Sequence, residues 1–153
     1  MKTLFFVLLI ALSSTACTSH KAKKQQNLKP IITFQKTACF GKCPVYSLEI
    51  FADGKIKYKG EKNTDKIGEY VKSLSKDEIK SLKESFISAD FFSFKDEYTS
   101  KKTDLPTTYI SFENEGKYKK VKDYSDAPEP LKNLERMIEK IVASDGWEKI
   151  QKK

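Results

Sequence analysis

The chain has 153 residues, 29 lysines and arginines against 21 aspartates and glutamates, and a formal net charge of +8. Arg136 is the only arginine, so the basicity comes from lysine. Proteins that read nucleic acids favour the planar, bidentate guanidinium of arginine, and this composition therefore argues against a nucleic-acid partner. With a single histidine, His20, and three cysteines, the chain has few of the ligands that zinc requires.

The first sixteen residues have the layout of a secretory signal peptide. Lys2 precedes nine apolar residues at positions 4–12, and a stretch of small residues follows them. Nine residues span roughly 14 Å as a helix, whereas the hydrocarbon core of a bilayer is about 30 Å thick, so the segment is too short for a permanent membrane span. We expect residues 1–16 to direct export and then to be removed, which takes away one lysine and lowers the net charge from +8 to +7.

Cys17 directly follows the predicted cleavage point. Ala16 before it completes the end of a lipobox, although Ser14 stands where leucine is usual. Acylation of Cys17 also leaves Cys39 and Cys43 as an even pair, as expected for an exported protein. We therefore predict a lipoprotein whose Cys17 carries acyl chains such as palmitate and anchors it to the membrane. The alternative is ordinary cleavage after Ala16, which would leave a free thiol.

After the signal peptide, composition divides the chain into three parts. Residues 17–30 hold the lipidated cysteine and a polar tether without periodicity, which is typical of a flexible linker. Residues 31–147 are long enough for a single domain with its own core, and residues 148–153 form a polar tail. The tether is basic and lacks an acidic cluster, so we place the protein in the cell envelope, on the periplasmic face of the outer membrane.

Hydrophobic period and turn residues predict two hairpins, two further strands and two helices in this domain. The predicted strands are 31–36, 45–51, 55–59, 68–74, 107–113 and 118–123. Ser75 and Glu78 have the spacing of a capping box that starts the first helix, Pro128 opens the last helix, and Gly146 stands at its expected C-cap. The predicted core positions are Ile79, Leu82 and Phe86 in the first helix, Phe91, Phe92 and Phe94 after it, and Leu131, Leu134, Ile138, Ile141 and Val142 in the second helix.

The register of the first hairpin follows from side-chain alternation. A three-residue loop at 52–54, with Gly54 in the left-handed conformation, pairs Ile50 with Ile56 and keeps apolar side chains on one face. A two-residue loop would instead set apolar side chains opposite lysines on the same face, which a half-buried strand resists. We therefore predict the three-residue loop.

In the second hairpin, pairing Ile110 with Val121 places Tyr109, Lys120 and Lys122 together on the face away from the core. The order strands, helix, strands, helix predicts an α+β fold, with an antiparallel sheet built from two hairpins plus flanking strands and two helices packed on one face. Tyr109, Lys120 and Lys122, which share this outward face with Ser111, thus form a candidate binding face for an anionic or carbohydrate-like surface.

Cys39 and Cys43 are separated by three residues and precede a predicted strand. Four extended residues span about 13 Å, but the Cα atoms of a disulfide lie about 4.4–6.8 Å apart, so a bonded pair requires the chain to turn back. Gly41 permits the turn, and Pro44 directs Cys43 into an extended conformation. We expect a structural disulfide. The alternatives are a zinc site and a redox dithiol, which usually has two intervening residues and opens a helix.

The C-x3-C-P-x-Y motif of residues 39–46 is the most distinctive one in the chain. Together with Asp53-Gly54, Tyr58-x-Gly60 and Asp104-x-Pro106-Thr107, it resembles a bacterial family of domains of unknown function that is common in envelope lipoproteins. The resemblance runs from Ile31 to Val142. It implies an envelope domain, and it brings no activity and no catalytic residues.

Within the domain, the sequence offers no nucleophile with its base and no metal-ligand set. His20 lies in the tether, and Asp96, Glu97 and Asp104 belong to a predicted solvated loop, so we expect no catalytic residue, metal or cofactor. We therefore predict a binding or interaction module rather than an enzyme. Its partners would be the membrane, through the lipid on Cys17, and an unknown envelope protein or polymer. A structural envelope component, a carboxylate-dependent hydrolase and a thiol-disulfide protein are the alternatives.

Overall fold

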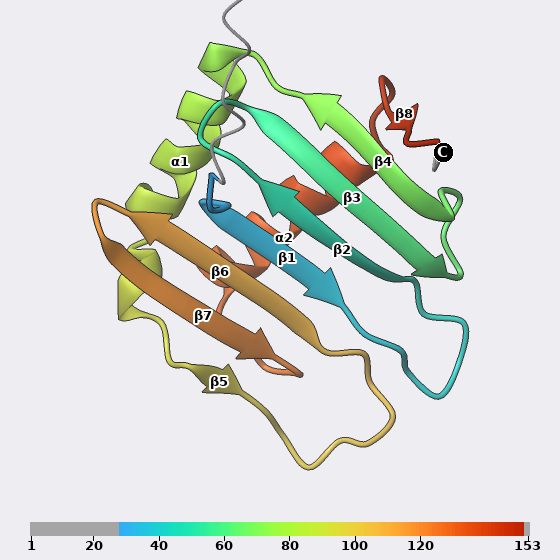
Figure 1. Ribbon diagram of the computed structural model, residues 1–153. Coiled ribbons are helices and arrows are strands. Elements are labelled where there is room, and N and C mark those ends of the chain that lie inside the picture. Colours follow the sequence, from blue (N-terminus) through green and yellow to red (C-terminus); the bar gives the residue numbers. More distant parts are fainter. Residues whose placement is uncertain (1–27, 152–153) are drawn as a thin grey trace, which may run out of the picture.

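A computed structural model describes residues 28–151. Its eight-stranded sheet has the order β5-β7-β6-β1-β2-β3-β4-β8 (Figure 1). The strands are β1 (Ile32–Lys36), β2 (Val45–Ile50), β3 (Lys55–Lys62), β4 (Gly68–Ser73), β5 (Glu97–Tyr98), β6 (Thr108–Asn114), β7 (Lys117–Asp123) and β8 (Glu148–Lys149). The helices are α1 (Lys76–Ser88), the short 3-10 turn η1 (Phe91–Ser93) and α2 (Glu129–Ala143). The predicted signal peptide, Cys17 and most of the predicted tether lie outside the described residues.

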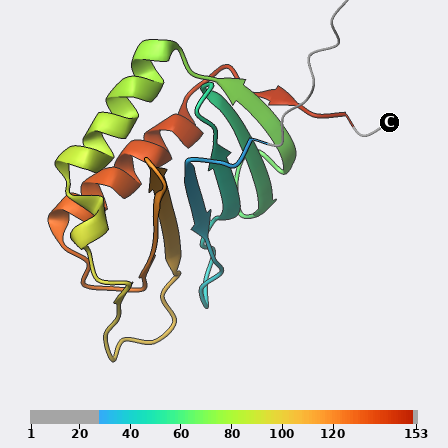
Figure 2. The same cartoon turned by 60° about the vertical axis from the view of Figure 1, so that its left-hand side comes forward.

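Both α-helices cover the same face of the sheet, and the opposite face is left open (Figure 2). The hairpins β2–β3 and β6–β7 flank β1 on its two sides, which agrees with the predicted α+β fold. All strand pairs are antiparallel except β5 with β7, so the sheet is mixed rather than purely antiparallel. Within residues 28–151, no helix is long and apolar enough to cross a membrane.

The predicted registers of both hairpins are confirmed. Ile50 lies opposite Ile56, and Ile110 lies opposite Val121, so each hairpin keeps its apolar side chains on the helix-facing side. Gly54 has a φ of +86° in the loop between β2 and β3. A Cβ atom there would come within 2.5 Å of the Leu74 carbonyl oxygen, so the loop requires glycine for both its conformation and its packing.

The helix boundaries follow local signals. The Ser75 hydroxyl accepts a hydrogen bond from the Glu78 amide at 3.2 Å, and the Glu78 carboxylate accepts one from the Ser75 amide at 2.7 Å, which confirms the capping box. α2 ends earlier than predicted. Ser144 rather than Gly146 is its C-cap, because the Ser144 amide already donates to the carbonyl oxygens of Lys140 and Ile141.

The core lies between the helices and the sheet, and the predicted apolar stripes supply most of it. Phe86 on α1 and Phe91 on η1 are fully buried and pack on Phe112 of β6, with ring centroids 4.9 Å and 6.0 Å away. Further buried positions are Ile79, Leu82, Phe94, Leu131, Leu134 and Ile138, and Phe92, Ile141 and Val142 are partly buried against them.

The sheet extends beyond the predicted strands at both edges. Glu148 and Lys149, which we expected in the polar tail, pair with β4, and Glu97 and Tyr98, which we expected in a loop, pair with β7. Both segments use the free backbone N–H and C=O groups of a strand that would otherwise be an edge of the sheet. Such pairing depends on backbone position and leaves no hydrophobic alternation in the sequence.

Candidate functional site

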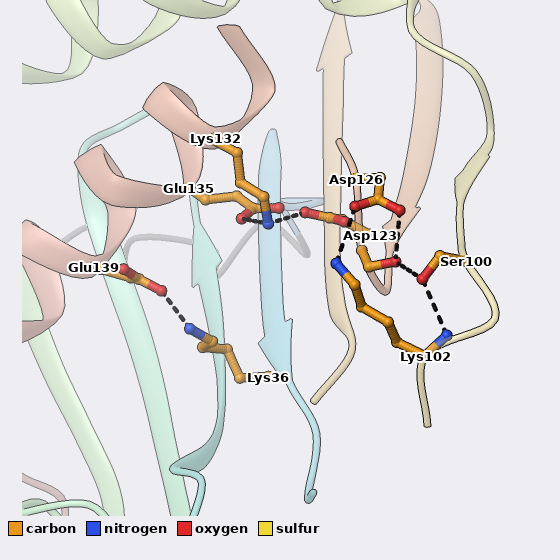
Figure 3. A network of polar contacts seen from close by, with 9 residues as sticks. Lys36, Ser100, Lys102, Asp123, Asp126, Lys132, Glu135 and Glu139 are labelled. Atoms are coloured by element: carbon orange, nitrogen blue, oxygen red, sulfur yellow. Dashed lines mark hydrogen bonds and ion pairs between the residues drawn. The ribbon is translucent and has the colours of Figure 1, made fainter. Parts of the chain in front are cut away.

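The helix-facing side of the sheet changes from apolar to polar at one end. The last apolar row across the sheet consists of Val121, Ile110, Phe34, Leu48 and Tyr58. The next row consists of Asp123, Thr108, Lys36, Tyr46 and Gly60. α2 lies above this polar row and presents Lys132, Glu135 and Glu139, which share one side of the helix because they are three and four residues apart (Figure 3). Charged side chains from helix and sheet therefore meet at this end.

A cavity of about 290 Å³ lies at this meeting point. Its lining residues are Lys36, Leu105, Pro106, Thr108, Asp123, Tyr124, Lys132, Glu135, Arg136 and Glu139. The sheet and α2 provide the charged walls, and the loop before β6 provides an apolar wall through Leu105 and Pro106. We call this cavity the polar pocket.

Two carboxyl groups of the polar pocket share one lysine. Lys132 Nζ is ion-paired with Asp123 Oδ2 and lies 3.3 Å from Glu135 Oε2 (Figure 3). The Asp123 side chain is 0% exposed and that of Glu135 is 7% exposed, whereas Lys132 reaches solvent. Burial alone would lower the pKa of Lys132, but the hydrogen bond to Asp123 and the charges of both carboxylates outweigh it and raise that pKa.

The second oxygen of each carboxyl group has no donor in the described part of the chain when Glu135 is ionised. Asp123 Oδ1 and Glu135 Oε1 are both buried and lack a hydrogen-bond partner within the described part of the chain. Burial raises the pKa of Glu135, the Asp123 carboxylate adds to this rise through its charge and a hydrogen bond, and Lys132 opposes it, so that the pKa lies at about 7. Near neutral pH, Glu135 thus exchanges between a protonated and an ionised form.

A second ion pair also lines the pocket. Lys36 Nζ on β1 is bonded to Glu139 Oε1 on α2 (Figure 3). Burial raises the pKa of the neighbouring Tyr46 hydroxyl, and the carboxylates of Glu139 and Glu135 add to that effect. The Tyr46 hydroxyl is therefore protonated and uncharged beside the two acids at physiological pH.

The loop of residues 37–44 between β1 and β2, which contains the two cysteines and is called the disulfide loop, lies at the same end of the sheet. Cys39 and Cys43 are bonded, with their Cα atoms 5.6 Å apart, which confirms the predicted disulfide. The Thr37 amide donates to the Thr107 carbonyl oxygen at 3.0 Å, and the Thr107 amide donates to the Thr37 hydroxyl at 3.0 Å. The disulfide loop and the loop that carries Leu105 and Pro106 are thereby tied together beside the pocket.

Gly60 has a steric role in this region. The segment after β3 folds back over it, so that a Cβ atom on Gly60 would lie 1.7 Å from the Lys66 carbonyl oxygen. The Tyr58 hydroxyl is hydrogen-bonded to the Thr64 hydroxyl of the same segment at 2.7 Å. The Tyr58-x-Gly60 element therefore holds this segment against the end of the sheet.

The three carboxylates that the sequence analysis considered for a hydrolase do not gather at one site. Asp96 is ion-paired with Lys119 at 2.8 Å, Glu97 is ion-paired with Lys122 at 2.8 Å, and Asp104 accepts a hydrogen bond from the Thr103 hydroxyl. None of the three acids lines the polar pocket.

Sequence reasoning missed Asp123 and Glu135, although both carried a signal. Asp123 lies two residues after Val121 and so continues the buried side of its strand. Glu135 lies four residues after Leu131, within the apolar stripe of α2. A carboxylate at a core position of each element is the pattern that points to a buried acid pair.

The three residues of the predicted binding face lie together on the open side of the sheet. Tyr109 lies opposite Lys122, and Lys120 Nζ lies 4.7 Å from the centre of the Tyr109 ring. Lys122 is engaged by Glu97, however, so one of the two cations is already paired.

Within residues 28–151, no group of three or more histidine, cysteine, aspartate or glutamate side chains is arranged to hold a metal ion. Cys39 and Cys43 are joined to each other, which removes them as zinc ligands. Position 20, which holds the single histidine, lies outside the described residues.

The chain belongs to the family described as Domain of unknown function (DUF6438), which matches residues 30–142. The match begins at the last residue of the predicted tether and ends in α2, so it contains the disulfide loop and every residue that lines the polar pocket. The family description names no activity. No curated protein matches the chain.

Proposed function

We propose that the protein is a binding module of the bacterial cell envelope, held by a lipid on Cys17 at the periplasmic face of the outer membrane, and that the polar pocket is its ligand site. The supporting observation is the pair of buried acceptors, Asp123 Oδ1 and Glu135 Oε1, which have no donor within the described part of the chain when Glu135 is ionised. A buried acceptor without a donor costs about 1–3 kcal/mol, and most buried polar groups in proteins have partners. A ligand that donates hydrogen bonds would supply them.

The size and lining of the pocket agree with a small polar ligand. A cavity of about 290 Å³ is close to the lower limit of ligand sites in proteins, and it combines several charged groups with the apolar wall of Leu105 and Pro106. The open sheet face, with Tyr109, Lys120 and Lys122, serves in this proposal as a second contact surface, toward an anionic envelope polymer or the membrane surface.

Ligand-observed NMR on the mature protein tests the proposal with a panel of polyols, amides, amines and carboxylic acids. At least one class should bind, its signal should be lost in Asp123→Asn, and it should be retained in Glu84→Gln. Glu84 is an exposed carboxylate on α1 and provides a matched control. The absence of any binder, or binding that Asp123→Asn leaves unchanged, contradicts the proposal.

A carboxylate-dependent hydrolase is the second candidate function. It is favoured by one observation, the contact of Asp123 with a Glu135 whose pKa of about 7 suits proton transfer at neutral pH. Chromogenic ester and glycoside substrates test this alternative. Turnover that is abolished by Asp123→Asn and by Glu135→Gln would establish an enzyme and overturn the binding module, whereas a lack of turnover favours binding.

A further inference from the structure

We infer that the polar pocket binds the ammonium group of a small amine between the carboxyl groups of Asp123 and Glu135. This inference rests on the proposed function, because it names the ligand class of the same pocket. It does not depend on the membrane anchor or on the open sheet face.

The first argument is hydrogen-bonding capacity. Lys132 occupies one oxygen of each acid, and when Glu135 is ionised the remaining oxygens, Asp123 Oδ1 and Glu135 Oε1, are buried without donors from the described chain. An ammonium group has three donors and no acceptor, so it can serve both oxygens at once. A carboxylate or phosphate ligand has only acceptors to offer them. A hydroxyl group has a single donor and can serve only one of the two.

The second argument is charge. Among the charged groups of the pocket, Lys36 is paired with Glu139, and Arg136 is paired with Glu129, each one to one. Lys132 alone faces two acids. When Glu135 is ionised, the cluster therefore carries one negative charge in excess, inside a largely desolvated site where an opposite charge is attracted strongly. A cationic ligand restores the balance, and an anionic ligand would worsen it.

The third argument is proton exchange. Without ligand, the proton of Glu135 serves as the donor between the two acids, because burial and Asp123 raise the pKa of Glu135 to about 7. An ammonium group that enters the pocket takes the place of this proton, which leaves to solvent as Glu135 becomes a carboxylate. The groups facing Glu135 are Asp123 from β7, Lys132 and Glu139 from α2, Lys36 from β1 and Tyr46 from β2. Binding should consequently weaken as the pH falls below 7.

The pocket also limits the rest of the ligand. Leu105 and Pro106 form its apolar wall, and the Tyr124 hydroxyl is held there by the Leu105 amide at 3.3 Å. The volume admits an ammonium group with a short carbon skeleton. Amino sugars, amino alcohols and amino-acid amides share this chemistry, and matched probes distinguish these sources.

The test is isothermal titration calorimetry on detergent-solubilised mature protein with glucosamine, ethanolamine and glycinamide. The neutral analogues of these probes are glucose, ethylene glycol and N-acetylglycinamide. We expect at least one amine to bind about tenfold more tightly than its analogue, because a charge-assisted hydrogen bond to a buried carboxylate is lost in the analogue. Titrations in two buffers of different ionisation enthalpy should detect proton release at pH 7 and tighter binding at pH 8 than at pH 6.

Variants separate the ammonium site from binding in general. Glu135→Gln should weaken the amine about tenfold and abolish proton release, and Asp123→Asn should weaken it to a similar degree. Glu84→Gln should behave like the wild type. Because either pocket variant can alter stability, each is first shown by circular dichroism to be folded at the titration temperature.

The outcomes distinguish the two proposals. If a neutral analogue binds as well as its amine and Asp123→Asn abolishes both, the pocket is a ligand site but not an ammonium site, and only this inference falls. If amines bind equally to wild type and to both variants, they bind elsewhere and the inference falls. If neither the amines nor their neutral analogues bind at millimolar concentration, this inference is overturned. It then no longer supports the proposal that the pocket is the ligand site.

Discussion

Asp123 at the end of β7 and Glu135 in the middle of α2 place their carboxyl groups against the same ammonium group, that of Lys132 (Figure 3). A single cation can compensate only one of two buried acids. The second acid is therefore held less readily in its charged form: burial and the neighbouring Asp123 raise the pKa of Glu135 to about 7. The stability of the fold and the chemistry of the pocket are therefore linked through one proton.

The stability of the domain should fall as the pH rises through neutrality. The pKa of Glu135 is about 7 in the folded protein and 4.5 without these interactions, so the folded state binds the proton more tightly. The contribution of Glu135 is fully present below pH 4.5 and is lost as the pH rises through about 7. It amounts to about 3 kcal/mol across this window. Urea unfolding at intervals from pH 5 to pH 8 measures it.

Glu135→Gln provides the comparison for that experiment. The amide is uncharged and keeps donors for Asp123, so the variant should lose most of the pH dependence and exceed the wild type in stability at pH 8. A wild-type free energy of unfolding that rises between pH 5 and pH 8, with the same slope in the variant, would show that Glu135 ionises normally.

Gly60→Ala should be strongly destabilising. The added Cβ atom would lie 1.7 Å from the Lys66 carbonyl oxygen, and backbone on both sides must move to relieve the clash. We expect a loss of about 2–3 kcal/mol in the free energy of unfolding. Gly116→Ala is the control. Its φ is +79° but no atom lies within 4 Å of the new Cβ, so only the backbone conformation is penalised, by about 1 kcal/mol. Equal losses in the two variants would mean that the segment after β3 does not press on Gly60.

Removal of the disulfide should lower the free energy of unfolding by about 2 kcal/mol, because the bond closes a five-residue ring and restricts the unfolded chain. The double variant Cys39→Ser, Cys43→Ser tests this with urea unfolding, and reduced wild type should match it. Non-reducing peptide mapping of protein taken from the envelope should yield a peptide with residues 39 and 43 joined. Quantitative labelling of both thiols in that material would argue against a structural disulfide in the cell.

Charge reversal on the open sheet face should weaken binding to anionic surfaces. Lys120→Glu with Lys122→Glu should reduce sedimentation of the mature protein with phosphatidylglycerol vesicles, most clearly at low salt, because exposed charges are screened within about 8 Å at physiological ionic strength. The control is Lys76→Glu with Lys80→Glu on α1, which changes the net charge equally on the opposite side of the sheet. Equal effects of both double variants would assign the attraction to net charge and remove the special role of this face.

Lipid attachment is tested at Cys17. The wild type should partition into detergent, and its mature form should have the mass of an acylated protein. Cys17→Ser should accumulate as a slower-migrating precursor. An intact mass without acyl groups in the wild-type mature protein would contradict the predicted lipid anchor. It would not bear on the proposal that the polar pocket binds a ligand.

Short-range patterns were sufficient for much of the fold. The pairing of Ile50 with Ile56, the positive φ of Gly54 and the Ser75–Glu78 capping box were all predicted from neighbours only a few residues apart. Each depends on turn geometry or on one helical turn, which nearby residues control. The disulfide of Cys39 and Cys43 belongs to the same class, since its ring closes within five residues.

The polar pocket required the tertiary structure. Lys36 and Glu139 are 103 residues apart, and no local rule predicts that they pair. Asp123 and Glu135 could be recognised as carboxylates at core positions of their elements, but not as partners, because their contact depends on how α2 crosses the end of the sheet. Secondary structure and hairpin register follow from interactions along a few residues of chain. The chemistry of the site arises where elements distant in sequence are packed against each other, and there desolvation and shared charges set the properties of every group.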